Sequence, residues 1–217
     1  MHHLHLPNLP KPRLRGWLHQ VAFVVSIPAG IALVALARGA EARVGAAIFA
    51  ASLTGLYGVS AAYHRGGWSG RALLRMRRLD HSMIFVLIAG SYTPVTLLAL
   101  HPGWGITLLV LAWVGAATGV LVTVVHLERW PNLGFVMYIV LGWLAIVAGP
   151  QLVRTLSGVE LALLVGGGFL YTVGAIVLAR KRPDPRPHVF GYHEVWHSFT
   201  LGAGAAHFLL VLMLVRA

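Results

Sequence analysis

Residues 103–125 read GWGITLLVLAWVGAATGVLVTVV, a stretch that contains no charged side chain. A helix of about 20 mainly apolar residues is long enough to cross the hydrocarbon core of a bilayer. Six further stretches of the chain have the same apolar character, so the sequence predicts an all-α integral membrane protein with seven transmembrane helices. The predicted spans are residues 17–37, 44–63, 79–100, 103–125, 133–149, 159–179 and 192–215.

The composition favours the same fold class. Of the 217 residues, 58% are hydrophobic and 11% are charged, whereas about a quarter of the residues of a soluble domain are charged. We therefore expect one seven-helix domain over residues 17–217, preceded by a flexible basic segment over residues 1–16. Cysteine is absent, which excludes disulfides and thiolate metal ligands.

The basic residues divide unequally between the two ends of the predicted helices. Of the 17 Lys and Arg, most precede the first span or follow the second, fourth and sixth spans, and one of these is Arg129. Because cytoplasmic loops are enriched in Lys and Arg, we expect the N-terminus to be cytoplasmic and the C-terminus to be outside. Topology and attraction to anionic lipid head groups then account for the net charge of +11 without a nucleic-acid partner. The sequence indicates no protein partner.

Four polar residues from three predicted spans lie at the same inner end. His64 ends the second span, Asp80 begins the third, and His193 and His197 lie in the first two turns of the seventh. Residues four apart share a helix face, so His193 and His197 can face one ion. Three histidines with a carboxylate or water are ligands that zinc favours, and the sequence therefore predicts a zinc site.

Such a site could catalyse hydrolysis, because zinc with one open position lowers the pKa of a bound water to about 7. Asp80 could bind the metal directly or act as a base through that water. Ser60, one turn before His64, could hold the water or an oxyanion. The alternative is that these are ordinary interfacial residues without a metal, with Asp80 serving only as a helix cap.

Three other residues leave alternatives open. Glu194 completes His-Glu-Val-Trp-His at 193–197, which fits the metalloprotease pattern in which the glutamate is the general base. No third ligand follows that motif, so Glu194 could instead pair with an inner arginine. His207 is about 15 Å along the helix from His197, and we expect it to bond to a neighbour within the membrane. His19 is at the depth of the site and could support it or lie at the interface.

At these residues the chain resembles the hemolysin III family, the bacterial branch of the progestin and adiponectin receptor superfamily. The resemblance covers nearly the whole chain from the second span onward. It is carried by Ser60-x-x-x-His64, by Arg78-Leu79-Asp80-His81-Ser82 continuing to Ala89-Gly90-Ser91-Tyr92-Thr93-Pro94, by Gly167-Gly168-x-x-Tyr171-x-x-Gly174, and by His193-Glu194-x-Trp196-His197 with His207-Phe208.

The resemblance implies a multi-pass protein of the bacterial inner membrane with zinc near the inner leaflet. It implies His64, His193 and His197 as direct ligands, and Asp80 acting mainly through a zinc-bound water with Ser60 close by. Ceramide-hydrolysing relatives in the superfamily suggest hydrolysis of a lipid amide. One departure is that residues 13–18, before His19, contain neither the acidic residue nor the Asn that family members often carry there.

Our leading hypothesis is a membrane zinc protein that hydrolyses a lipid or influences the state of the membrane. The second hypothesis is a non-catalytic protein, a sensor or cytolytic factor, in which zinc ties the helices together. The third is an intramembrane metalloprotease.

Overall fold

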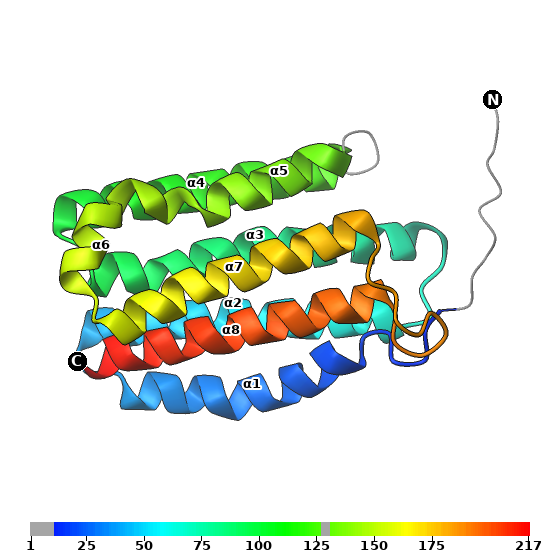
Figure 1. Cartoon of the computed structure of the whole chain (residues 1–217), viewed down its shortest axis with the longest axis horizontal. Helices are drawn as coiled ribbons and strands as arrows, with labels where there is room; N and C mark the ends of the chain where they lie inside the picture. The colour runs from blue at the N-terminus through cyan, green and yellow to red at the C-terminus, as the bar shows by residue number, and fades with distance from the viewer. Residues whose placement is uncertain (1–10, 127–130) are drawn as a thin grey trace.

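The computed structural model describes residues 11–126 and 131–217, and within them the regular structure is helical apart from one bridge pair, Arg186 and Phe190. The helices lie side by side along the long axis of the molecule (Figure 1). Their bounds are α1 Trp17–Leu36, α2 Ala40–Arg65, α3 Gly70–Leu98, α4 Pro102–His126, α5 Pro131–Gly142, the 3-10 helix η1 Leu144–Ala148, α6 Gly149–Thr155, α7 Gly158–Arg180 and α8 Tyr192–Arg216.

Seven helices in the described part of the chain are long and apolar enough to span a membrane, which confirms the predicted fold class. Six of them are single elements. The remaining span, Leu133–Thr155, combines most of α5 with η1 and α6. The predicted bounds agree to within a few residues for most spans. The expected position of Arg129 on the basic side, and the expected flexibility of residues 1–10, lie outside the described residues.

Two spans differ in length from the prediction. Helix α3 begins at Gly70 rather than at residue 79, because the arginine-rich stretch before the apolar run continues the helix instead of forming a loop. Asp80 therefore lies within a helix that begins ten residues earlier, and it is not a helix cap. The fifth span continues to Thr155, six residues beyond the predicted end.

The fifth span breaks inside the apolar region, where free backbone groups are costly. The hydroxyl of Tyr92 on α3 resolves this break: it lies within donating distance of the carbonyls of Leu141 (3.1 Å) and Gly142 (3.2 Å), and it accepts from Ala145 N at 2.7 Å. Backbone groups released where α5 ends are thus bonded to a neighbouring helix, and the span stays intact without being one continuous helix.

Helix α8 packs against α1, α2, α3 and α7 and is the central element around which the site is built. Small residues allow the close approach, as expected for helices in lipid. At Gly174 of α7 a Cβ atom would lie only 2.6 Å from the ring of Trp196 on α8. Apolar side chains also cover the outside: Ile31, Ile106 and Leu121 are more than 60% exposed, as lipid-facing residues would be.

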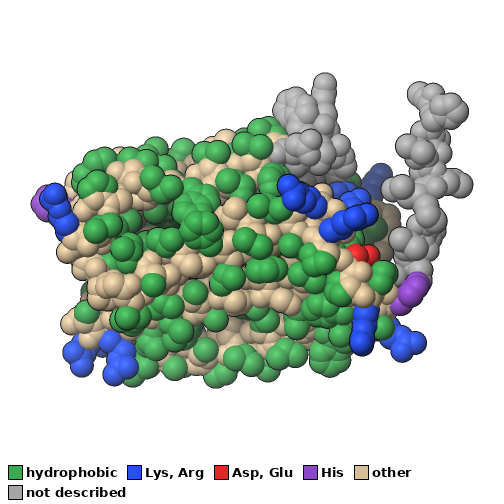
Figure 2. All heavy atoms as spheres, in the orientation of Figure 1, with side chains coloured by type: hydrophobic (Ala, Val, Ile, Leu, Met, Phe, Trp, Pro, Cys, Tyr) green, Lys and Arg blue, Asp and Glu red, His purple; other side chains and the backbone are tan. Residues whose placement is uncertain are grey.

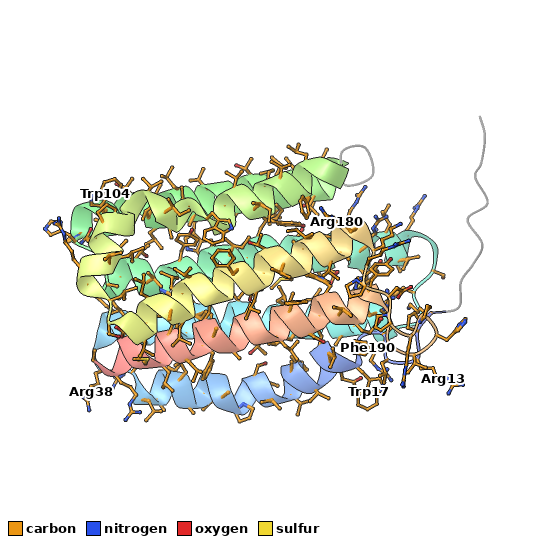
Figure 3. The ribbon with its side chains drawn as sticks, viewed as in Figure 1. Arg13, Trp17, Arg38, Trp104, Arg180 and Phe190 are labelled. Carbon is orange, nitrogen blue, oxygen red and sulfur yellow. The ribbon has the colours of Figure 1, made fainter. Side chains whose placement is uncertain are left out.

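The two ends of the bundle differ. Figure 2 shows hydrophobic side chains along the middle and Lys and Arg confined to the ends. One end carries residues 11–16, the turn between α2 and α3 and the segment between α7 and α8; we call it the basic end. Arg13, Arg180 and Trp17 lie there, whereas Arg38 and Trp104 lie at the opposite end (Figure 3). The C-terminus is also at the opposite end (Figure 1).

Candidate metal centre

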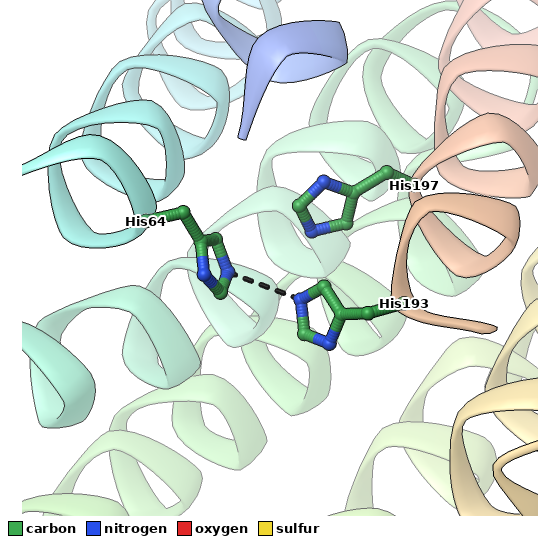
Figure 4. A group of neighbouring side chains, drawn as sticks. All are labelled: His64, His193 and His197. Atoms are coloured by element: carbon green, nitrogen blue, oxygen red, sulfur yellow. Dashed lines mark hydrogen bonds between the residues drawn. The ribbon is translucent and has the colours of Figure 1, made fainter. Parts of the chain in front are cut away.

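Three histidines from two helices converge near the basic end. His64 lies in the last turn of α2, and His193 and His197 lie in the first two turns of α8 (Figure 4). One nitrogen of each ring lies within 4.8 Å of the others. The α-helical repeat places His193 and His197 on one face of α8, and the packing of α2 against α8 brings His64 to that face.

The rings meet edge to face rather than stacking. The His64 ring is inclined by 71° to that of His193 and by 61° to that of His197. Nε2 of His64 and Nε2 of His193 are 3.1 Å apart. Nitrogen ligands of a tetrahedral zinc ion with bonds of about 2.0–2.1 Å are roughly 3.3 Å apart, so this spacing is close to that of a metal site.

The environment of the group also suits a metal. His197 is 1% exposed and His64 7% exposed. Nδ1 of His197 is buried and has no hydrogen-bond partner among the described residues. Buried polar atoms without a partner are rare in folded proteins. Three clustered, largely buried imidazoles fit the donor set that zinc takes in the absence of thiolates.

Asp80 and Ser60 lie on the neighbouring helices as a pair. Ser60, on α2 one turn before His64, is buried and is positioned to hydrogen-bond with the Asp80 carboxylate on α3. Asp80 is 14% exposed, and its Oδ2 is 3.6 Å from Nδ1 of His81. Asp80 does not belong to the tight three-histidine group. The structure thus brings Asp80 together with Ser60, outside the three-histidine group.

His19 is the residue that the sequence left undecided, and the structure brings it to the site. Its ring is 2% exposed and stacks on His197 with centroids 3.8 Å apart and planes 8° from parallel. The Thr200 hydroxyl donates to the His197 carbonyl (2.7 Å), so it accepts from Nε2 of His19 at 3.0 Å. His19 therefore fixes the orientation of the His197 ring from α1.

Glu194 is fully buried, and both of its oxygens are engaged. Oε1 accepts from Arg15 Nε at 2.6 Å, and Oε2 accepts from the backbone N–H of Gly191 at 2.8 Å. The carboxylate thus caps the first turn of α8 and pairs with an arginine, as one of the two sequence interpretations expected. A general base must reach a substrate or water, and Glu194 is fully buried with both oxygens bonded within the protein.

Residues 11–16, which we call the N-terminal strap, cross the basic end beside the histidines. Lys11 Nζ donates to the His64 carbonyl at 3.0 Å, and the backbone N–H groups of Arg13 and Leu14 donate to the carbonyls of His188 and Val189. Gly16, with φ +80°, packs so closely that a Cβ there would lie 2.8 Å from Cβ of His64. The strap joins α2, α8 and the loop before α8.

His81 and His207 do not belong to the three-histidine group. Nδ1 of His81 donates to the Arg77 carbonyl of its own helix at 2.9 Å. Nε2 of His207 donates to the Leu164 carbonyl on α7 at 3.3 Å, which confirms the expected bond to a neighbour.

Comparison with known proteins shows to which family the chain belongs. The family model described as haemolysin-III related matches residues 8–208. The chain belongs to the haemolysin-III-related family. It is 37% identical over 198 residues to the Hemolysin-3 homolog of Bacillus subtilis (strain 168), with 89% of each chain covered. It is also 37% identical over 201 residues to Hemolysin-3 of Bacillus cereus, covering 91% of this chain and 88% of that one. No solved structure matches the chain.

Membership of the haemolysin-III-related family agrees with the seven apolar helices, and the chain is a multi-pass membrane protein. The matched region includes the whole of the three-histidine group and the strap. The sequence signal for His19 is its position at the inner end of the first span, the end at which His64 and His193 also lie. The sequence does not show how α1 is rotated about its axis, so it could not predict that the His19 ring would face His197.

Proposed function

We propose that this haemolysin-III-related protein binds zinc through His64, His193 and His197 and hydrolyses a lipid amide or ester at that site. The observation that carries the proposal is the buried three-histidine group, with one nitrogen of each ring within 4.8 Å of the others and a carboxylate–hydroxyl pair on the adjoining helices. A zinc ion held by three protein ligands supplies a Lewis acid that acidifies water and polarises a carbonyl.

The chain's own residues then have defined tasks. Asp80 accepts the proton of the attacking water and returns it to the leaving amine or alcohol, which is the work of a general acid–base group. Ser60 keeps the Asp80 carboxylate oriented. Water adds to the acyl carbon and the bond to nitrogen or oxygen breaks, so one water is consumed and a fatty acid and an amine or alcohol are released. The N-terminal strap limits access of bulk water from the basic end.

The location and direction of the protein belong to the same proposal. We place it in the bacterial inner membrane with the basic end in the cytoplasm, since Lys and Arg accumulate on that side. Exposed arginines in the first turns of α3, Arg71, Arg75 and Arg77, and the exposed Arg180, Lys181 and Arg182 would contact anionic lipid head groups. The site then lies beneath the inner leaflet, within reach of lipid carbonyls.

Elemental analysis tests the metal. Protein purified without a metal-binding tag should contain about one zinc per chain, and His64→Ala should contain little, because losing one of three ligands opens the site. His188→Ala is the matched control, since its side chain is exposed at the same end and belongs to no metal group. Equal zinc in wild type and His64→Ala would refute the site.

Turnover tests the hydrolase. The protein is reconstituted in vesicles that contain N-acyl and ester lipids, and free fatty acid is followed by mass spectrometry. Release should be zinc-dependent, and Asp80→Asn should lower its rate by about 10²–10⁴-fold, the range for a lost acid–base group. If wild type and Asp80→Asn release no more fatty acid than empty vesicles, the hydrolase proposal is wrong even where zinc is bound.

A structural zinc is the second candidate, favoured because the three histidines join α2 to α8. It is compatible with a cytolytic role of the kind that the name of the Bacillus cereus relative indicates for that protein. Chelation separates the two candidates. A structural ion should lower the unfolding temperature sharply when removed, whereas a catalytic ion should leave the protein folded and stop turnover.

A further inference from the structure

Two cations from separate segments lie beside the three-histidine group at the basic end. Lys11 belongs to the strap, and its Nζ lies 3.0 Å from the carbonyl oxygen of His64. Arg77 belongs to α3 and precedes Asp80 by three residues. Residues three apart on a helix are neighbours, so Arg77 is close to the face of Asp80 and lies about 4.5 Å nearer the end of the bundle. Both cations are therefore on the side of the site that faces the water at the basic end.

The electrostatic surroundings of Tyr63 and His64 support this placement. These two residues are adjacent on α2, and the centroids of their rings are 4.6 Å apart. The charges of Arg77 and Asp80 act on the side chain of Tyr63, and the charge of Lys11 acts on the ring of His64. The two cations thus approach the same part of the molecule, the last turn of α2, from α3 and from the strap.

The acidic side chains near these cations have other partners. Glu194 is paired with Arg15, and Oδ1 of Asp184 accepts from a backbone N–H at the start of α8 at 2.9 Å. Among the described residues, no carboxylate lies within ion-pair distance of Lys11 or Arg77. Both cations are exposed, so an anion from outside the protein can reach them.

A lipid of the inner leaflet can supply such an anion. With its acyl carbonyl at the three-histidine group, its head group would point toward the basic end. In ceramide 1-phosphate or phosphatidic acid only a few covalent bonds separate the acyl carbonyl from a phosphate, which would then lie toward Lys11 and Arg77. Ammonium and guanidinium groups donate charge-assisted hydrogen bonds to phosphate oxygens, and these bonds are stronger than neutral ones.

We propose that the lipid hydrolysed at this site is anionic and that Lys11 and Arg77 bind its phosphate. This inference rests on the proposed function, because it takes the acyl carbonyl to lie at the three-histidine group. It narrows the substrate class to acyl lipids that carry a phosphate next to the acyl linkage. Lys11 and Arg77 select the substrate and take no part in breaking the bond.

Two pairs of lipids test the proposal, because the members of each pair differ only in the phosphate. Ceramide 1-phosphate is compared with ceramide for the amide, and phosphatidic acid with diacylglycerol for the ester. The full chain carries Asp80→Asn to prevent hydrolysis and is immobilised at its C-terminus, at the end opposite the site (Figure 1). It is equilibrated with detergent micelles that contain equal amounts of both lipids, and the retained lipid is quantified by mass spectrometry. The phosphate lipid should be retained about tenfold more, as expected for hydrogen bonds to a charged group.

Two further substitutions, each with a matched control, test where the phosphate binds. Arg77→Gln and Lys11→Gln should each bring the ratio of the two retained lipids toward one. Arg75→Gln removes the same charge from α3 at a position turned by about 140° from Asp80, and Arg13→Gln removes it from the strap. Both controls should keep the ratio of the parent protein. Arg77 is exposed, so Arg77→Gln should fold and decides the matter by itself if Lys11→Gln loosens the strap.

Three binding results would overturn the proposal. The first is equal retention of both lipids of a pair, and the second is an equal fall of the ratio in the control variants, which would assign the preference to the general charge of the basic end. The third is displacement of the phosphate lipid by excess inorganic phosphate, which would assign the cations to a free anion.

Turnover in wild-type protein separates this proposal from the hydrolase proposal. A preference for the phosphate lipid without release of fatty acid would refute the hydrolase and support the phosphate site. Hydrolysis of ceramide and diacylglycerol at the same rates as their phosphate counterparts would support the hydrolase and overturn the anionic substrate.

Discussion

Glu194 is fully buried, and a buried carboxylate must be paired if it is to stay charged. Arg15 and the backbone of Gly191 occupy its two oxygens. His193 directly precedes it, Trp196 and His197 follow it by two and three residues, and all of them lie in the first two turns of α8. The contribution of Glu194 is therefore to hold the first turn of α8, and with it the pair of histidines, against the N-terminal strap.

Glu194→Gln preserves the size of the side chain and removes its charge. We expect a loss of about 1–3 kcal/mol of stability, because Arg15 is left with a neutral partner. The folded variant should still bind zinc, since the three histidines are intact. Thermal unfolding in detergent and elemental analysis measure the two quantities.

Arg15→Ala provides the control for that prediction. The double variant should lose less stability than the sum of the single variants, because both remove one interaction. An unchanged unfolding temperature in Glu194→Gln, together with lost peptide cleavage, would instead support the metalloprotease interpretation.

The N-terminal strap is the element that joins parts of the basic end far apart in sequence. It bonds to the end of α2 through Lys11, to the loop before α8 through its backbone, and to α8 through Arg15. Arg65, at the end of α2, lies over the ring of Trp17 with 5.0 Å to its centroid. These contacts keep α1 in register with the three-histidine group and bring His19 against His197.

Gly16→Ala tests the strap. The residue has φ +80°, so alanine adds about 1–2 kcal/mol of backbone strain. The new Cβ would also press on Cβ of His64. Gly70→Ala is the matched control, since Gly70 has φ +51° and nothing within 4 Å of an added Cβ. We expect Gly16→Ala to lower both the unfolding temperature and the affinity for zinc, and Gly70→Ala to lower the unfolding temperature alone. Equal zinc affinities in the two variants would contradict a contact between strap and site.

The whole molecule is a bundle with an odd number of spans in its described part, and the strap and the C-terminus lie at opposite ends (Figure 1). Helices long enough to cross the bilayer must place these ends on different sides of it. From the excess of Lys and Arg at the basic end we expect that end to be cytoplasmic.

Because the chain has no cysteine, single cysteines report topology without background. Ser69→Cys lies in the exposed turn between α2 and α3, and His101→Cys in the exposed turn between α3 and α4. With the outer membrane opened, a membrane-impermeant maleimide should label His101→Cys in intact spheroplasts. It should label Ser69→Cys only after lysis. The reverse pattern would invert the proposed orientation.

Apolar run length was sufficient to predict seven spans, because crossing a bilayer is a one-dimensional requirement on the chain. Apolar run length was not sufficient to predict the residues at which the spans begin and end. The start of α3 was missed because arginines at positions 71, 75, 77 and 78 are good helix formers outside the membrane. The break of the fifth span was missed because Tyr92, from another helix, is what makes the break tolerable.

For the site, helical periodicity alone put His193 and His197 on one face, and the alternation of spans put His64 at the same depth. The role of Glu194, the stacking of His19 on His197 and the bonding partner of His207 each depend on how helices are rotated and which partners they meet. Those facts come from contacts between residues far apart in the chain, as with Arg15 and Glu194. A sequence specifies depth and face through its local repeat, whereas only the packed bundle decides which faces touch.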